Sequence, residues 1–265
     1  MPKLIMHLRL SRWVASQLKN KLRKHSHICS SSSAFVSKLL DVTVAEDDAL
    51  IRFDIAELYM TGEHDLICSS SASIIDSELR PIFKHAVSFL LGNQFVKTSN
   101  AVYECCRGSG MGAIYSGELS DASFLALSEL PYALDRAVWA RFGVKCFLRF
   151  RDDIFMIMSL AERYERNSDF LQHWKAISMP YRIKLEDISK TSVIMLDMRV
   201  YKGPKWRVTG KLDIAINWKP TSLGVPLART SAHPPAIFDN WPFAELKRFR
   251  KLSTSLIGVS DALKV

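Results

Sequence analysis

The sequence predicts an α+β fold in which small antiparallel sheets carry helices packed on one face. Short runs rich in aromatic and branched residues, notably 49–55 and 145–158, have the composition of strands. Between them, the segment 76–91 shows the apolar periodicity of an amphipathic helix. Its apolar positions are Leu79, Ile82, Phe83, Ala86, Val87 and Leu90. Strands in small sets, covered by such helices, give the layered arrangement of this class.

The remaining elements follow in chain order. Helices are expected at 6–24, 76–93, 117–142 and 161–178, the third being broken or kinked near Pro131. Strands are expected at 49–55, 101–106, 145–151, 153–158, 182–187, 192–201 and 210–218. Gly203-Pro204 is expected to form the turn of a late β-hairpin.

Two adjacent carboxylates interrupt the apolar run from Phe147 to Met158. Asp152 and Asp153 fall where a hairpin turn is expected. A purely structural hairpin turn more often contains Asp-Gly or Asn-Gly. Buried carboxylates without a partner are energetically unfavourable. The acids therefore either form a solvated turn or bind cations.

A third carboxylate strengthens the second alternative. Asp54 ends the strand-like run 49–54. Together with Asp152 and Asp153 it gives the carboxylates that two-metal phosphoryl transfer needs, because Mg²⁺ prefers carboxylate and phosphate oxygens. We expect acids from neighbouring strands to hold two Mg²⁺ or Mn²⁺ ions.

Further motifs follow these acids in a fixed order. Tyr59 lies five residues after Asp54, and a glycine-rich stretch then reads Tyr103-Glu-Cys-Cys-Arg-Gly-Ser-Gly-Met-Gly112. After Asp153 the chain reads Ile183-Lys184-Leu-Glu, Met195-Leu-Asp-Met-Arg-Val-Tyr-Lys202, Trp218-Lys-Pro-Thr221 and Ser231-Ala-His-Pro-Pro235. This order resembles a reverse transcriptase of the Penelope-like retroelement type, over roughly residues 10–254.

The resemblance implies a role for each matching residue. Asp54, Asp152 and Asp153 would hold the metals, and Lys184 would stabilise the leaving pyrophosphate. Tyr59 would exclude a 2′-hydroxyl and so favour deoxynucleotides. Gly108, Met111 and Gly112 would form the loop that contacts template and nucleotide. Taken alone, each match also fits a purely structural role. Tyr59 could be a core tyrosine, the glycine-rich stretch a plain loop, and Lys184 an exposed lysine at a strand end.

The resemblance also implies the domain organisation. Residues 1–48 match partial fingers with a basic N-terminal segment, residues 49–221 match the palm, and residues 222–265 match the start of a thumb or connection. The chain is thus expected to be a palm core with partial neighbours. Its expected partners are an RNA template, a DNA primer and deoxynucleoside triphosphates.

Several positions depart from the family pattern, among them Thr61-Gly62-Glu63, where the family has Asn-Ile-Pro. Arg151 stands before the Asp pair, where the family is usually apolar, and Cys105 stands where it often has glutamine. Ser116-Gly117 replaces a small residue followed by proline. Arg151 is expected to pair with the metal ligands or with a primer phosphate, or to impair the site.

Composition agrees with a polyanionic partner. The 265 residues carry 36 Lys and Arg against 27 Asp and Glu, a net charge of +9. Basic residues around the late hairpin alternate with Trp206 and Trp218, a pattern that suits nucleic acid, although solvated faces with core tryptophans explain it equally well. No apolar run reaches the length of a membrane span, so no membrane partner is expected.

The remaining features concern location. The five cysteines have no Cys-x-x-Cys spacing, which argues against disulfide or zinc frameworks and for an intracellular protein. A nuclear location is expected. The N-terminal region has no acid before Asp41, so an organelle transit peptide is the alternative.

Two other functions remain open from the sequence. The first is a catalytically inactive nucleic-acid-binding relic, which the departures and missing neighbours favour. The second is a palm with other two-metal chemistry, such as a nucleotide cyclase, against which the motif order and the late hairpin argue.

Overall fold

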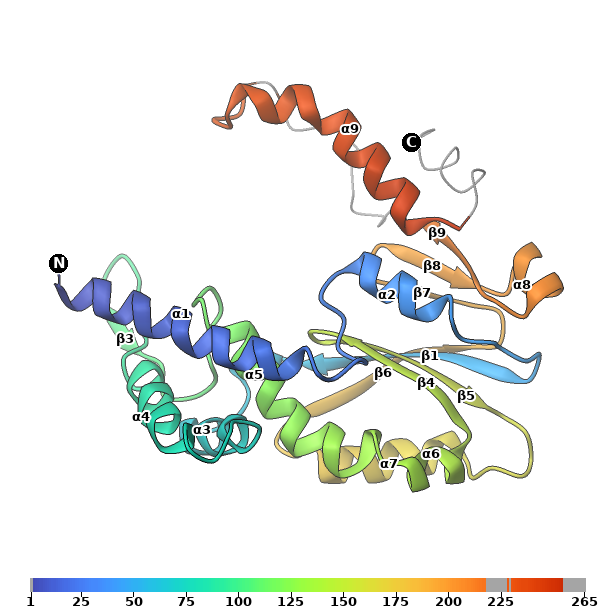
Figure 1. Cartoon of the computed structure of the whole chain (residues 1–265), viewed down its shortest axis with the longest axis horizontal. Coiled ribbons are helices and arrows are strands. Elements are labelled where there is room, and N and C mark those ends of the chain that lie inside the picture. Colours follow the sequence, from blue (N-terminus) through green and yellow to red (C-terminus); the bar gives the residue numbers. More distant parts are fainter. Residues whose placement is uncertain (1, 218–227, 229, 255–265) are drawn as a thin grey trace.

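A computed structural model of the chain describes residues 2–217, 228 and 230–254, with side chains from residue 7 onward. Its centre is an antiparallel four-stranded sheet in the order β4-β5-β1-β6 (Figure 1). The strands are β1 (Asp48–Ala56), β4 (Val144–Phe150), β5 (Asp153–Ser159) and β6 (Arg182–Ser189). The predicted strand pair that flanks the two acids is confirmed as the β4–β5 hairpin.

One face of this sheet is covered by helices. These are the π-helical segment η2 (Leu125–Ala133), α6 (Arg136–Phe142) and α7 (Asn167–Ile177). Alternate residues of β1, namely Ile51, Phe53 and Ile55, point into this core. Trp174 of α7 is fully buried there and meets the ring of Phe53 edge-on, 5.4 Å away.

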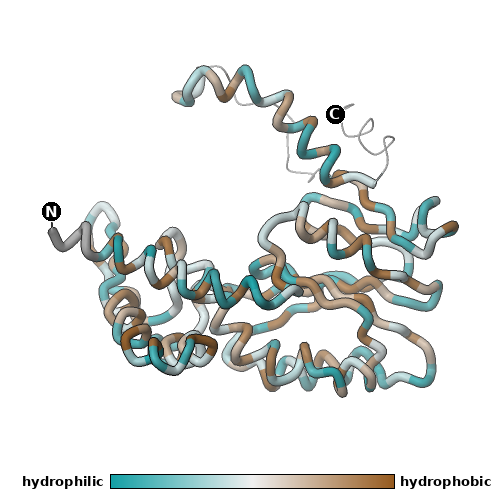
Figure 2. The backbone as a smooth tube through the Cα atoms, viewed as in Figure 1, coloured by the Kyte–Doolittle hydropathy of each residue, from teal (hydrophilic) through white to brown (hydrophobic). Residues whose placement is uncertain are grey.

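The opposite face carries a second layer. Helix α2 (Ser32–Leu39) packs on it together with a three-stranded sheet of β7 (Ser192–Met195), β8 (Met198–Tyr201) and β9 (Asp213–Ile216). Leu50, Phe155 and Ile157 fill this second core from the main sheet. Figure 2 shows the hydrophobic residues concentrated along the central strands, as a sheet buried on both faces requires.

A helical group stands beside the sheets (Figure 1). It contains α1 (Pro2–Leu22), α3 (His64–Ser73), α4 (Arg80–Leu91) and α5 (Ser116–Phe124), which share one buried cluster. A short hairpin of β2 (Phe95–Lys97) and β3 (Val102–Glu104) lies in the loop after α4. Helix α5 continues into η2, so it links the helical group to the underside of the main sheet.

The predicted interruption of helix 117–142 is present. Pro131 lies inside η2, where its missing N–H suits the wider π-helical turn. The chain then restarts as α6, whose N-cap Asp135 accepts a hydrogen bond from Ala137 N at 2.6 Å. Gly143, with φ of 66°, ends that helix.

Two local predictions in the late hairpin are wrong. The stretch 192–201 is not one strand, because Leu196 adopts a left-handed φ of 57° and the chain turns between β7 and β8. Gly203-Pro204 does not form the hairpin turn but begins the helix α8 (Pro204–Thr209), since proline is pre-organised for a first helical turn. Three other helices, α2, α3 and α9 (Pro235–Leu252), were not predicted. The motif Trp218-Lys-Pro-Thr221 lies outside the described residues, as do residues 222–227 and 229.

Candidate active site

Three of the predicted site residues form a row across the main sheet. Asp54 of β1 lies directly opposite Asp153 of β5 and, on its other side, directly opposite Lys184 of β6. Directly paired residues project from the same face of a sheet, with Cβ atoms roughly 5 Å apart. The fold therefore brings Asp54 together with Asp153 and Lys184, which lie 99 and 130 positions later in the sequence.

Asp152 belongs to the tight turn between β4 and β5. Its carbonyl oxygen accepts a hydrogen bond from Ile55 N at 2.9 Å, which ties the turn to the strand that carries Asp54. Arg151, the other turn residue, has a left-handed φ of 55°, an uncommon conformation for a non-glycine residue. All three acids are thus held by one strand and one adjoining hairpin.

The electrostatics of this row are unbalanced toward negative charge. Burial raises the pKa of Asp54, and Asp152 and Glu186 raise it further, against the opposing effect of Lys184 and Arg52. Burial also raises the pKa of Asp153, which Arg52 opposes and the neighbouring Asp152 and Asp54 reinforce. Such a cluster favours the arrival of a cation.

The three acids offer oxygen donors of the kind that divalent cations bind. Among the described residues, no group of three or more His, Cys, Asp or Glu side chains is arranged so that it could hold a metal ion. However, Asp153 Oδ1 is buried without a hydrogen bond, its nearest cation being the Arg52 guanidinium at 3.2 Å. Mg²⁺ usually takes one or two protein carboxylates and completes its ligands with water and phosphate. The donor set fits such an ion.

Tyr59 lies close to these acids. It belongs to the one-turn helix η1 (Leu58–Met60) that directly follows β1. Burial raises the pKa of the Tyr59 phenol, and its charged neighbours include Arg151 and Asp152. The fold thus brings Tyr59 to the acid row.

The glycine-rich loop packs against the backbone of η1. Ser109 N donates a hydrogen bond to Tyr59 O at 2.7 Å, and Gly108 N donates to Gly62 O at 2.8 Å. A Cβ at Gly108 would lie 2.6 Å from Met60 Cα, so only glycine permits this approach. Met111 is 74% exposed and Gly112, with φ of 91°, faces open space. Gly108 therefore anchors the loop, whereas Met111 and Gly112 stand on its open part.

Several neighbours of the acids were not predicted from the sequence. Arg52 and Glu186 each lie two residues from a predicted site residue, so strand periodicity could have placed them on the same face. Arg151 does not pair with the predicted metal ligands. Its guanidinium instead contacts Glu118 and Asp121 of α5, for which the sequence offers no signal.

Two basic residues of the late hairpin have internal roles. Lys202 Nζ donates to the carbonyl oxygens of Glu46 and Asp48, both at 2.8 Å, and Lys211 Nζ donates to Asp41 O at 2.6 Å. Trp206 donates to Val44 O at 2.7 Å. For these three residues the structure therefore supports a role in packing the chain, which was the alternative to a role in nucleic-acid binding.

Solved structures with similar folds are polymerases. A telomerase from Candida albicans in complex with a TWJ fragment of telomeric RNA has a TM-score of 0.59 and 14% identity, over 91% of this chain and 41% of its own. The apo telomerase of Candida tropicalis has a TM-score of 0.58 and 15% identity, over 94% of this chain and 45% of its own. The RNA-dependent RNA polymerase of a human picobirnavirus has a TM-score of 0.51 and 14% identity, over 77% of this chain and 39% of its own.

The chain spans less than half the length of these three proteins. No family model and no curated protein matches its sequence. None of the described helices is long and apolar enough to cross a membrane. At these identities the likeness concerns the fold: the chain has an α+β polymerase palm fold, shared with telomerase reverse transcriptase and a viral RNA-dependent RNA polymerase.

Proposed function

We propose that this chain is the palm of an RNA-directed DNA polymerase, which adds deoxynucleotides to a primer 3′ end. The observation that carries the proposal is the pairing of Asp54 with Asp153 on neighbouring strands, beside Asp152 in the adjoining turn. In this role Asp54, Asp152 and Asp153 hold two Mg²⁺ or Mn²⁺ ions. Such ions lower the barrier by stabilising the attacking and leaving oxygens.

The other predicted residues act around the acids. Lys184, beside Asp54, supplies a positive charge toward the leaving pyrophosphate. Tyr59 lies under the incoming sugar and excludes a 2′-hydroxyl. Gly108 holds the loop to η1, and Met111 and Gly112 face template and nucleotide.

The partners are an RNA template, a DNA primer and deoxynucleoside triphosphates. The net charge of +9 favours polyanions, and two of the similar telomerases were solved with an RNA fragment. The Penelope-like type, the nuclear location and the division at residues 48 and 221 rest on motif order alone.

Primer extension tests the proposal. Purified chain receives a primed RNA template, deoxynucleotides and Mg²⁺ or Mn²⁺, with Asp152→Ala as the matched variant. Loss of a metal ligand costs several kcal/mol, so extension should fall by at least about a hundredfold. Equal extension by both proteins would contradict the assignment of the acids.

Tyr59 tests the choice of sugar. Tyr59→Ala should raise ribonucleotide incorporation relative to deoxynucleotide incorporation by about tenfold, because the steric rejection is lost. The measurement compares kcat/KM for the two nucleotides. An unchanged ratio would assign Tyr59 to packing alone.

A second candidate is an inactive nucleic-acid-binding relic. It is favoured by the Arg52–Asp153 ion pair, since Arg52 occupies one carboxylate that the metals need. This candidate predicts salt-sensitive binding of primed RNA without extension by the wild-type chain.

A further inference from the structure

Arg151 makes an unusual turn directly before Asp152. Its φ of 55° lies in the left-handed region, which a long side chain adopts only where the surroundings hold it. The direction of the following residue depends on this conformation. Whatever fixes Arg151 therefore also sets where the Asp152 carboxylate points.

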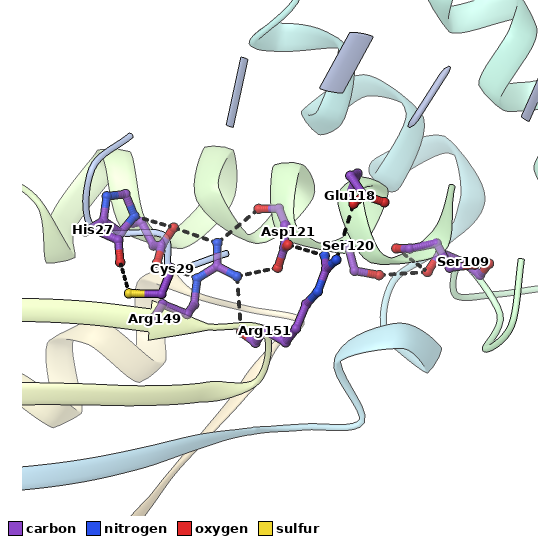
Figure 3. A network of polar contacts seen from close by, with 10 residues as sticks. His27, Cys29, Ser109, Glu118, Ser120, Asp121, Arg149 and Arg151 are labelled. Carbon is purple, nitrogen blue, oxygen red and sulfur yellow. Dashed lines mark hydrogen bonds and ion pairs between the residues drawn. The ribbon is translucent and has the colours of Figure 1, made fainter. Parts of the chain in front are cut away.

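Helix α5 holds the Arg151 guanidinium through ion pairs with Glu118 and Asp121 (Figure 3) and through close contact with Gly117. One nitrogen, Nη1, contacts Asp121 Oδ2, and the other, Nη2, lies 3.3 Å from Glu118 Oε1. The guanidinium lies flat on Gly117, where an added Cβ would be 2.7–2.9 Å from Nη1, Cζ and Nη2. A side chain at position 117 would therefore displace the Arg151 guanidinium from its present position.

A second arginine holds the same turn from behind. Arg149 is fully buried and donates to Asp121 Oδ1 at 2.5 Å and to the carbonyl oxygen of Arg151 at 3.1 Å. Its Nε also donates to Glu129 Oε1 at 2.7 Å, and Glu129 contacts His27. Each carboxylate oxygen of Asp121 thus accepts a hydrogen bond from a different arginine, and these two bonds fix the position of the side chain.

We propose that Gly117, Glu118 and Asp121 form a cradle that holds Arg151 away from the acid row and thereby positions Asp152. They are positioning residues and touch no substrate. A released guanidinium would sit one residue from Asp152 and beside Asp153, where it would compete with a cation for their carboxylates. The cradle explains how an arginine is accommodated immediately before the acid pair.

The metal-positioning role rests on the proposed function, but the cradle itself does not. A double-mutant cycle between positions 117 and 151 separates the two. Its proteins are the wild-type chain, Gly117→Ala, Arg151→Met and the double variant, with Gly92→Ala as a control glycine of helical φ outside the site. Each is measured by urea unfolding without metal, by Mn²⁺ titration followed by electron paramagnetic resonance, and by primer extension.

Gly117→Ala should lower both the urea midpoint and, by about tenfold, the Mn²⁺ affinity of the wild-type chain. With Arg151→Met in place it should raise the midpoint, because alanine favours the helix, and change the affinity by less than about twofold. Gly92→Ala should leave Mn²⁺ binding unchanged.

Equal effects of Gly117→Ala in both backgrounds would overturn the cradle. Coupling in unfolding without a change in Mn²⁺ affinity would overturn its positioning role. The unfolding measurement needs neither metal nor nucleic acid, so it tests the cradle even if the wild-type chain extends no primer.

Discussion

Two charged groups meet at the β4–β5 turn and are built in opposite ways. The acid row brings Asp54, Asp152, Asp153 and Glu186 close to Arg52 and Lys184, and the pKa values of Asp54 and Asp153 are raised. The network behind it joins the carboxylates Glu118, Asp121 and Glu129 to Arg149, Arg151 and His27 (Figure 3).

The network shows the reverse electrostatics. Burial opposes the charge of Glu129, but Arg149 and His27 outweigh it and lower its pKa to about 2. Burial likewise opposes the charge of Arg149, yet Glu129 and Asp121 raise its pKa. The difference shows that this fold neutralises the charges of the buried network and leaves the charges of the acid row unbalanced, as the proposed metal site would require.

The largest change in stability is expected when the charge network around Arg149 is disrupted. Arg149→Met leaves Glu129 and Asp121 without their shared cation and should lower the free energy of unfolding by about 3–5 kcal/mol. Urea unfolding at neutral pH measures this. Arg207→Met, on the exposed side of α8, is the control and should change it by less than about 0.5 kcal/mol. A loss below about 1 kcal/mol for Arg149→Met would mean that the network is not stabilised as a unit.

A second test follows the pH dependence of Glu129. Its pKa is about 2 in the folded chain against a usual 4.5, so its ionised form stabilises the fold above pH 4.5. That contribution is lost as the pH falls toward 2. The stability difference between the wild-type chain and Glu129→Gln should therefore shrink by about 3 kcal/mol over this range. Parallel stability curves would contradict the role given to Arg149 and His27.

These tests address contacts that the sequence could not reveal. The strands around Asp54 and Asp152 were predictable because apolar alternation and a double acid stand out locally. The network was not, because its contacts join residues such as His27 and Glu129, 102 positions apart. No motif in the sequence links these charges, whereas the order of the motifs around Asp54 and Asp152 does indicate that those acids act together.

The missed helices have a local cause. Helix α3 contains four serines in ten residues and α2 has only eight residues, so neither carries a strong helical pattern. Tertiary packing against α5 and against the main sheet stabilises them instead. At Gly203-Pro204 the turn prediction failed because Gly-Pro also suits the start of a helix.

The smallest change in stability is expected for a substitution in the acid row. Without metal, Asp54→Asn removes one repelling charge from the row and should raise the free energy of unfolding by up to about 1 kcal/mol. Urea unfolding in the presence of a chelator gives this value. A loss of more than about 1 kcal/mol would show that Asp54 is paired for structure, like the carboxylates behind it.

The most direct measurement of metal binding by the acid row is thermal unfolding with and without Mn²⁺, for the wild-type chain, Asp54→Asn, Asp153→Asn and the control Asp239→Asn, an exposed carboxylate of α9. A free ion at about ten times its Kd stabilises a folded chain by about 1.4 kcal/mol. This gain is expected for the wild-type chain and Asp239→Asn, and it should be lost in Asp54→Asn and Asp153→Asn. Equal stabilisation of all four proteins, or of none, would contradict the claim that the acid row binds metal.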